Sequence, residues 1–237
     1  MQAIYKREMR AYFTSPIGYI FVAIFFCANG ALFSYLTLQA GEDSNISSYF
    51  MMLLFLFIIL IPLLTMKLLC EERRQKTEQL LLTAPVGLAD MVGAKFLAAY
   101  TMFSGTFLGS LVMCLIPYAV YCEKVNWASI IGNAVGILCI GGAFTAIGLF
   151  ISALTENQFT AAISTIAIIV VLLFISFANT YIGSSAVRIV LSWISIFARF
   201  SDFSYGILNV SSLVYYISIT FVFLFLTVRV YENRRWN

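Results

Sequence analysis

Six long apolar stretches dominate the sequence and restrict what the chain can fold into. They cover residues 17–38, 51–66, 96–121, 127–154, 159–181 and 212–228. Each is close to the roughly 20 residues that an α-helix needs to cross a bilayer. A helix is the expected form because it satisfies its backbone hydrogen bonds internally where no water is available. The sequence therefore predicts an all-α integral membrane protein with six transmembrane helices, built as a single domain over residues 1–237.

The composition excludes a soluble fold. Hydrophobic residues make up 62% of the chain and charged residues 11%, and the mean hydropathy is +0.95. This leaves too few charges to cover a water-exposed surface. The formal charge of +3 is small for 237 residues, whereas a nucleic-acid-binding protein needs a clustered basic face. We therefore expect the lipid membrane, and no nucleic acid, among the partners.

The sequence contains few residues suited to catalysis or metal binding. It has no histidine, which is the commonest metal ligand and general base. Its five cysteines form no CxxC pair, and they are interpreted as apolar packing residues. It also lacks the GxxxxGK[ST] phosphate-binding loop, and no ionisable residue lies in the middle of an expected span. We therefore expect no catalytic site, metal or bound cofactor in this chain, so that energy for any work must come from a partner.

The basic residues predict how the chain is oriented in the membrane. Cytoplasmic segments of membrane proteins carry an excess of Lys and Arg. Only Lys124, Arg188 and Arg199 fall on one side of the six expected spans. The other eleven of the fourteen fall on the opposite side: Lys6, Arg7, Arg10, Lys67, Arg73, Arg74, Lys76, Lys95, Arg229, Arg234 and Arg235. Both termini and the segment from 67 to 95 are therefore predicted to be cytoplasmic.

The first thirteen residues have the pattern of an amphipathic helix. Apolar residues recur at helical spacing, opposite a charged face that includes Lys6, Arg7 and Arg10. This pattern predicts an interfacial helix on the membrane surface. An ordinary basic segment flanking the first span is the alternative. The helix should end at Ser15, because the residue before Pro16 is disfavoured in helical conformation.

Proline and glycine add local detail to the spans. Pro62 is expected to kink the second span, since proline removes one hydrogen bond of the helix. Two GxxxG spacings permit close contact between helices, although ordinary helix packing also explains them. They are formed by Gly105 with Gly109 and by Gly132 with Gly136.

The segment 71–87, between the second and third spans, has the highest density of charge in the chain. Residues 71–82 are expected to form a helix of roughly 18 Å, with Pro85 and Gly87 as stop signals. Such a helix could dock on a soluble partner through ion pairs and apolar side chains; the alternative is a solvated loop whose leucines lie in the lipid interface. The candidate contact residues are Glu71, Glu72, Arg73, Arg74, Thr77, Glu78, Leu80 and Leu81.

These segments resemble a known family. The order of elements and the string EERRQKTEQLLLTAPVG are similar to the permease subunits of type-2 ABC exporters. The opening IYKREMRAYFTSPIGYIF and the close RFSDFSYGILNVSSLVYYISITFVFLFLTVRVYENRRW are most similar to the gliding-motility-associated branch of that family. The resemblance extends across nearly the whole chain.

The resemblance implies an ATP-driven exporter in the bacterial inner membrane. The chain would pair with a second permease chain and with cytosolic ATPase subunits that hold ATP and Mg, and it could also contact an extracytoplasmic accessory subunit. Residues 71–87 would be the coupling segment, containing the coupling helix, and 1–13 the connecting interfacial helix. Residues 182–208 would be an extracytoplasmic re-entrant element before the last span. Its aromatic residues Trp193, Phe197, Phe200 and Phe203 are suited to a membrane interface.

The sequence also leaves a second hypothesis open. The chain could be a membrane anchor or scaffold subunit of a larger envelope or motility complex, which would bind partners without transporting anything. The transported substrate and the residues that would contact it are unknown at this stage, because fold-level similarity does not fix what a permease carries.

Overall fold

A computed structural model describes residues 1–38, 46–75, 87–121, 127–181, 195–197, 199–207 and 209–236. Within these residues all regular elements are helical. Six of the helices are long and apolar enough to cross a membrane, as judged from their length and composition. The prediction of an all-helical, multi-pass membrane protein is therefore confirmed.

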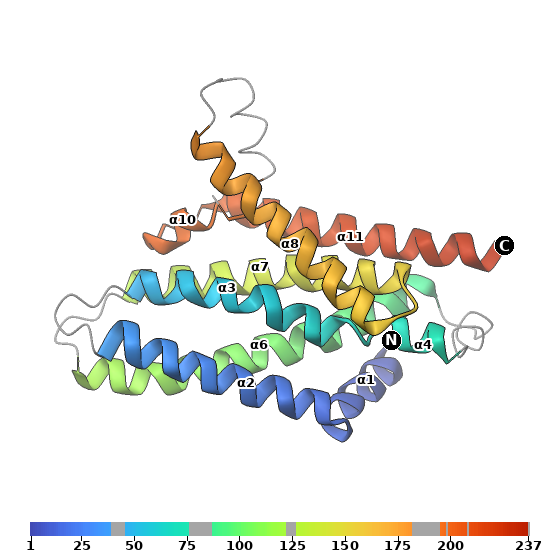
Figure 1. Cartoon of the computed structure of the whole chain (residues 1–237), viewed down its shortest axis with the longest axis horizontal. Coiled ribbons are helices and arrows are strands. Elements are labelled where there is room, and N and C mark those ends of the chain that lie inside the picture. Colours follow the sequence, from blue (N-terminus) through green and yellow to red (C-terminus); the bar gives the residue numbers. More distant parts are fainter. Residues whose placement is uncertain are drawn as a thin grey trace.

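Two helices form the centre of the bundle. In α3 (Ile46–Thr65) and α7 (Trp127–Leu154), 67% and 72% of the most apolar stretch is buried inside the protein. The corresponding fraction lies between 11% and 28% in the four outer helices. These helices, which pack around the centre (Figure 1), are α2 (Pro16–Phe33), α6 (Leu88–Tyr121), α8 (Gln158–Tyr181) and α11 (Val210–Trp236).

Three of the predicted spans agree with the observed helices to within one residue at each end, and the other three are shorter than the observed helices. α7 has the predicted bounds, α8 begins one residue early, and α2 is continued by the π-helix η1 (Ser34–Leu38). By contrast, α3 begins at Ile46, α6 begins at Leu88, and α11 continues to Trp236.

Polar contacts explain the three longer helices. Ser47 Oγ, in the first turn of α3, donates a hydrogen bond to the carbonyl oxygen of Ser204 (3.0 Å). The first turns of α6 bury Lys95 completely. Near the end of α11, an Arg234 guanidinium nitrogen donates to the carbonyl oxygen of Ala153 (2.6 Å). Hydropathy alone ends each span at its polar residues, whereas packing partners keep the helix intact beyond them.

In the part of the chain that the structure describes, three shorter α-helices lie at the two ends of the bundle. α1 (Gln2–Thr14) and α4 (Cys70–Arg74) lie at the end that also carries both chain termini (Figure 1). We refer to this end, formed by α1, α4 and the last turns of α11, as the polar end. The third short helix, α10 (Phe200–Ser204), packs near the opposite end, against the first turns of α7.

The chain turns sharply between α1 and α2, as the sequence predicts. Ser15 has extended backbone angles (φ −94°, ψ 149°), and Pro16 occupies the first turn of α2. The helix of the predicted interfacial segment is thus present. Its location on a membrane surface stays a prediction.

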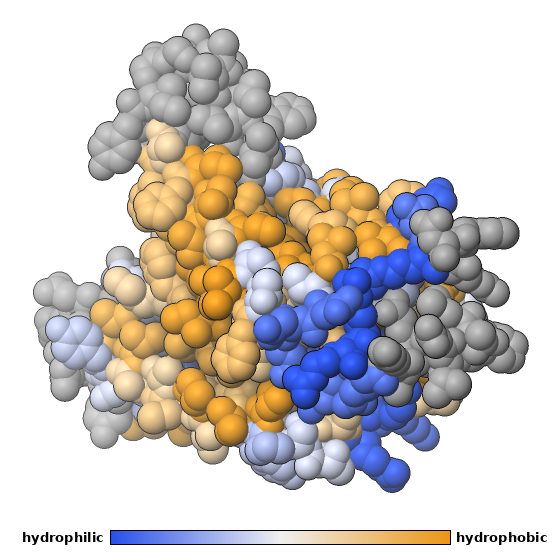
Figure 2. Space-filling model, turned by 45° about the vertical axis from the view of Figure 1, so that its right-hand side comes forward, coloured by the Kyte–Doolittle hydropathy of each residue, from blue (hydrophilic) through white to orange (hydrophobic). Residues whose placement is uncertain are grey.

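Charged residues are concentrated at the polar end. The described basic residues there lie in α1, in or beside α4, at the start of α6 and at the end of α11, while Arg199 lies beside α10 at the other end. Figure 2 shows the hydrophilic surface gathered toward one end, with apolar surface over much of the rest of that face. The orientation in the membrane was predicted from this uneven distribution of basic residues between the two ends. Lys76, Lys124 and Arg188 lie outside the described residues.

The glycine spacings differ in their surroundings. A Cβ atom on Gly132 would lie 2.7 Å from the carbonyl oxygen of Phe203, and one on Gly136 would lie 3.0 Å from the Phe203 ring. This pair therefore permits the close approach of α10 to α7. A Cβ on Gly105, in contrast, would meet nothing within 4 Å, and one on Gly109 would lie 3.7 Å from the Phe26 ring, an ordinary contact distance. Among the described residues, this second spacing is therefore not needed for a close approach.

Pro62 is buried inside α3, and the helix continues past it to Thr65. A hydrogen bond from the Met66 amide to the Pro62 carbonyl oxygen (2.9 Å) extends the pattern beyond the helix end. The expected kink, and any part of it in gating, stays a prediction.

One expectation about the segment 182–208 is wrong. Phe200 and Phe203 are fully buried against protein, whereas the sequence suggested that they face a membrane interface. The physical reason is the space left by Gly132 and Gly136 on α7, which α10 fills. Residues 182–194, 198 and 208 lie outside the described residues, so the re-entrant element as a whole stays a prediction.

The turn between α1 and α2 provides a test of the fold. A Cβ on Gly18 would lie 2.2 Å from the backbone carbonyl oxygen of Tyr12. Gly18→Ala should therefore force α1 away from α2 and destabilise the protein by about 1–3 kcal/mol. Thermal unfolding of the purified protein in detergent measures this loss.

Gly30→Ala is the matched control, because Gly30 lies on the same helix and an added Cβ there meets nothing within 4 Å. It should be neutral or slightly stabilising, since alanine is favoured over glycine inside a helix. Equal stability of the two variants would contradict the tight turn.

Candidate functional site

A completely buried lysine joins three helices at the polar end. Lys95, on α6, has no exposed side-chain surface. Its Nζ lies 3.0 Å from Glu8 Oε1 of α1 and 2.8 Å from Glu72 Oε1 of α4. It also donates a hydrogen bond to the carbonyl oxygen of Leu68, in the turn between α3 and α4 (2.8 Å). A buried ammonium group requires such partners, because it has lost its water.

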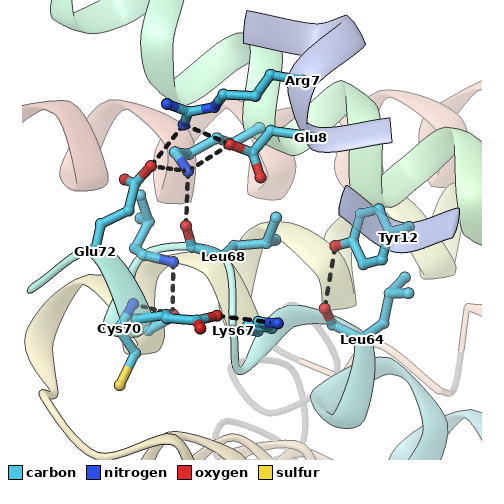
Figure 3. A network of polar contacts seen from close by, with 12 residues as sticks. Arg7, Glu8, Tyr12, Leu64, Lys67, Leu68, Cys70 and Glu72 are labelled. Atoms are coloured by element: carbon cyan, nitrogen blue, oxygen red, sulfur yellow. Dashed lines mark hydrogen bonds and ion pairs between the residues drawn. The ribbon is translucent and has the colours of Figure 1, made fainter. Parts of the chain in front are cut away.

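Arg7 completes the arrangement. One of its guanidinium nitrogens lies 2.7 Å from both Glu8 Oε1 and Glu72 Oε1, and Figure 3 shows these contacts converging from α1 and α4. We call Arg7, Glu8, Glu72 and Lys95 the Lys95 cluster. It contains two positive and two negative groups, so that the charges balance. Arg7 forms the outer edge, with 53% of its side chain exposed, whereas Glu8 and Glu72 are only 13% and 15% exposed.

The cluster shifts the titration of its members. Burial by itself would raise the pKa of the Glu8 carboxyl, but the Lys95 ammonium and the Arg7 guanidinium together hold that pKa below its ordinary value. For Arg7, burial opposes the charge, while Glu8 and Glu72 raise the pKa further. Nearby opposite charges thus outweigh desolvation at both residues.

α4 begins on a cap that comes from another helix. Its own N-cap position, Leu69, provides no side-chain cap. Instead, Ser152 Oγ of α7 accepts hydrogen bonds from the backbone N–H groups of Leu69 (3.2 Å) and Cys70 (3.1 Å). These amides belong to the group that a helix start leaves without internal partners. Because Ser152 is fully buried, it fixes the start of α4 to the end of α7.

The rest of α4 is also tied to its surroundings. Arg73 donates a hydrogen bond to the carbonyl oxygen of Leu154 (3.0 Å) and forms an ion pair with Glu156 (2.7 Å). Together with Arg234, it places positive charge at the C-terminus of α7, where the helix dipole favours cations. Glu71 pairs with Lys67 one turn earlier (3.2 Å).

Two tyrosine side chains of α1 form hydrogen bonds to other helices of the bundle. Tyr12 donates a hydrogen bond to the carbonyl oxygen of Leu64, near the end of α3 (3.2 Å, Figure 3), and burial raises its pKa. Tyr5 donates to Thr101 Oγ1 of α6 (3.2 Å). With the Lys95 cluster, these bonds fix α1 to both α3 and α6.

The structure corrects the shape of the predicted coupling helix. The helix that contains Glu71, Glu72, Arg73 and Arg74 ends at Arg74, and Gln75 is its C-cap. It is therefore not the start of one continuous helix over 71–82. The reason is that these charges are held by partners on different elements, with Glu72 turned toward Lys95 and Arg73 toward α7. Thr77, Glu78, Leu80 and Leu81 lie outside the described residues.

The cations predicted for the interfacial helix separate into two groups. Lys6 and Arg10 are exposed, whereas Arg7 belongs to the Lys95 cluster. It stays a prediction that the α4 residues contact an ATPase. It also stays a prediction that Lys6 and Arg10 contact lipid.

Sequence reasoning missed the central role of Lys95. It placed the start of the third span at Phe96 and interpreted Lys95 as one more cytoplasmic basic residue. One signal was present, because apolar or small residues surround this lysine in the string MVGAKFLAAY. Its partners, Glu8 and Glu72, are far away in the sequence and cannot be read from its neighbours. Among the described residues, no group of three or more His, Cys, Asp or Glu side chains could hold a metal ion.

Comparison with known proteins identifies the family. Residues 31–231 match the family model described as ABC-2 family transporter protein. The chain belongs to this family. ABC-2 proteins of this kind are membrane components of transporters and work with an ATPase partner. No curated protein matches the chain.

The ABC-2 match covers part of the candidate site. It includes Lys67, α4 and Lys95, while Arg7 and Glu8 precede it. Similarity to the gliding-motility branch is not confirmed by the match and stays a prediction.

The Lys95 cluster predicts a large loss of stability on removal of the ammonium. Lys95→Met leaves Glu8 and Glu72 facing each other with Arg7 as their remaining cation in the cluster. Breaking a buried ion pair in this way costs about 3–5 kcal/mol, which thermal unfolding in detergent would detect. Lys6→Met removes the same charge from an exposed position and should change stability by about 0.5 kcal/mol or less. If both variants were equally stable, the cluster would contribute nothing.

The lowered pKa of Glu8 predicts a pH dependence of stability. A carboxyl whose pKa is lower in the folded protein stabilises the fold fully above its ordinary pKa of 4.5, and this stabilisation is lost as the pH falls through the folded value. Wild type should therefore lose more thermal stability than Glu8→Gln as the pH is lowered from about 6 to about 3. Loss of the same size in both proteins would show that Glu8 does not titrate in this way.

Proposed function

We propose that this chain is the permease subunit of an ATP-driven ABC exporter. It forms part of the substrate path and couples to a separate cytosolic ATPase subunit through residues 71–87. The ABC-2 family match and the six apolar helices support a transport component. The observation that carries the coupling proposal is the attachment of α4 to α1, α6 and α7 through the Lys95 cluster and Ser152.

The contacts of α4 with α1, α6 and α7 could transmit a movement of the docking segment to the transmembrane helices. A force applied to residues 71–87 first reaches α4, whose start is capped by Ser152 of α7. Glu72 passes the movement to Lys95 of α6 and, through Arg7, to α1. Separating these buried charges costs more than moving the helices together. The ATPase thus pulls on α1, α6 and α7 at once.

The remaining parts of the proposal concern the surroundings of the chain. The polar end faces the cytoplasm, with both termini, because most of the basic residues gather there. ATP and Mg are bound by the ATPase subunit and not by this chain. A second permease chain completes the transporter in the bacterial inner membrane, and the opposite end is available to an extracytoplasmic accessory subunit.

A pull-down tests the proposal. The tagged protein is purified from native membranes in mild detergent, bound proteins are identified by mass spectrometry, and ATP hydrolysis is measured on the eluate. We expect an ATPase with a phosphate-binding loop to copurify. Leu81→Asp should reduce its recovery at least tenfold, because a charge replaces an apolar contact of the predicted docking segment.

The matched control places the same new charge at the opposite end. Tyr205 follows α10 and is 81% exposed, so Tyr205→Asp should leave ATPase recovery unchanged. Both variants should keep the thermal stability of the wild type. Recovery of structural proteins alone, without ATP hydrolysis, would contradict the permease and favour a scaffold subunit. Normal ATPase recovery with Leu81→Asp would contradict the assignment of the docking segment.

A further inference from the structure

A cavity of about 400 Å³ lies at the Lys95 cluster, and all four residues of the cluster contribute to its wall. The rest of the wall comes from α1, from the turn into α2, and from the end of α3 with α4. Volumes of roughly 300–1,000 Å³ are typical of small-molecule sites. The proposed function uses the contacts within the Lys95 cluster but assigns no role to the open space beside them, so the contents of the cavity are a separate question.

The wall of the cavity combines two chemically different groups of side chains. Arg7, Lys67 and Glu71 are charged lining residues, which we call its charged part, and Ala11 and Ile17 are apolar ones, which we call its apolar part. A ligand that fits both parts must have a charged portion and an apolar portion. This description fits a lipid better than a soluble nucleotide or sugar.

The position of the cavity matches the depth of lipid headgroups. The candidate membrane span of α2 begins at Pro16, and both Ser15 and Ile17 line the cavity. Lys67 and Glu71 lie in the last turns of another candidate span, Ile46–Arg74. The cavity thus lies at the ends of two candidate spans, as does the interfacial region of a bilayer.

The charges of the cavity wall have both signs. Lys67 Nζ and Glu71 Oε2 are 3.2 Å apart, and their side chains are 32% and 27% exposed. Arg7 is still more exposed. Lys95 differs from them, because it is completely buried among its own partners. Glu8 and Glu72 also line the cavity, but they are only 13% and 15% exposed. The most exposed charged groups of the wall are therefore two cations, Arg7 and Lys67, and one carboxylate, Glu71, which complement a headgroup that carries a phosphate and an ammonium.

We propose that this cavity binds one phosphatidylethanolamine-type lipid of the surrounding leaflet. Its phosphate is bound by Arg7 and Lys67, its primary ammonium donates to Glu71, and its acyl chains leave past Ala11 and Ile17. Charge-assisted hydrogen bonds of this kind are stronger than neutral ones. The lipid is a resident of the site and not the transported substrate, so the proposal does not depend on transport.

Native mass spectrometry of the delipidated protein in detergent tests the proposal. Three lipids with identical acyl chains are titrated: phosphatidylethanolamine, phosphatidylcholine and phosphatidylglycerol. We expect phosphatidylethanolamine to bind about tenfold more tightly than the other two. Choline has no N–H to donate to Glu71, and glycerol has no positive charge.

Two variants locate the binding. Lys67→Ala removes a phosphate partner, and Ala11→Trp fills the apolar part without changing a charge; each should weaken phosphatidylethanolamine binding about tenfold. Arg10→Ala is the matched control, since Arg10 is an exposed cation of α1 that does not line the cavity. It should bind the lipid like the wild type.

Three results would overturn the proposal. Equal binding of the three lipids would show that no headgroup is selected. Equal losses in Lys67→Ala and Arg10→Ala would indicate general attraction to the membrane. If water-soluble glycerophosphoethanolamine bound as tightly as the lipid, the ligand would be a soluble phosphate compound instead.

Discussion

The structure depends most on the constraint that a buried ammonium group must keep its acceptors. Lys95 satisfies this constraint with Glu8, Glu72 and the carbonyl oxygen of Leu68, which belong to three separate parts of the chain. Each acceptor must stay within hydrogen-bond reach, because water cannot replace it at a fully buried site. The positions of α1, of α4 and of the turn before it are therefore set relative to α6.

Directional contacts between helices are numerous at the two ends of the bundle, whereas most of the buried side chains in its core are apolar. Apolar side chains attract one another without a preferred direction, and they alone would leave the register of neighbouring helices loosely defined. Register is fixed at the polar end by the Lys95 cluster and Ser152. At the opposite end, the Ser47 and Ser129 hydroxyls both donate to the carbonyl oxygen of Ser204, which ties α10 to α3 and α7.

Sequence patterns predicted the parts of this fold that depend on local chemistry. Long apolar runs located the six helices, and Pro16 located the turn after α1. The errors arose where a residue's partner is distant in the chain. Phe203 is buried because of Gly132 and Gly136 on α7. Glu72 was predicted to face a partner protein, but its charge is neutralised from α6 and α1, and no spacing rule relates these positions.

Because Ser152 of α7 caps the start of α4, α4 cannot form its final structure until α7 has been synthesised. A helix of five residues is too short to be stable by itself. The groups that hold both of its ends, Ser152 Oγ and the Leu154 carbonyl, belong to α7, which leaves the ribosome well after α4. The segment therefore acquires its final shape only once the fourth span has been inserted. A bundle that still lacks α7 does not present a formed α4, so that assembly with other subunits through α4 waits until α7 has been made.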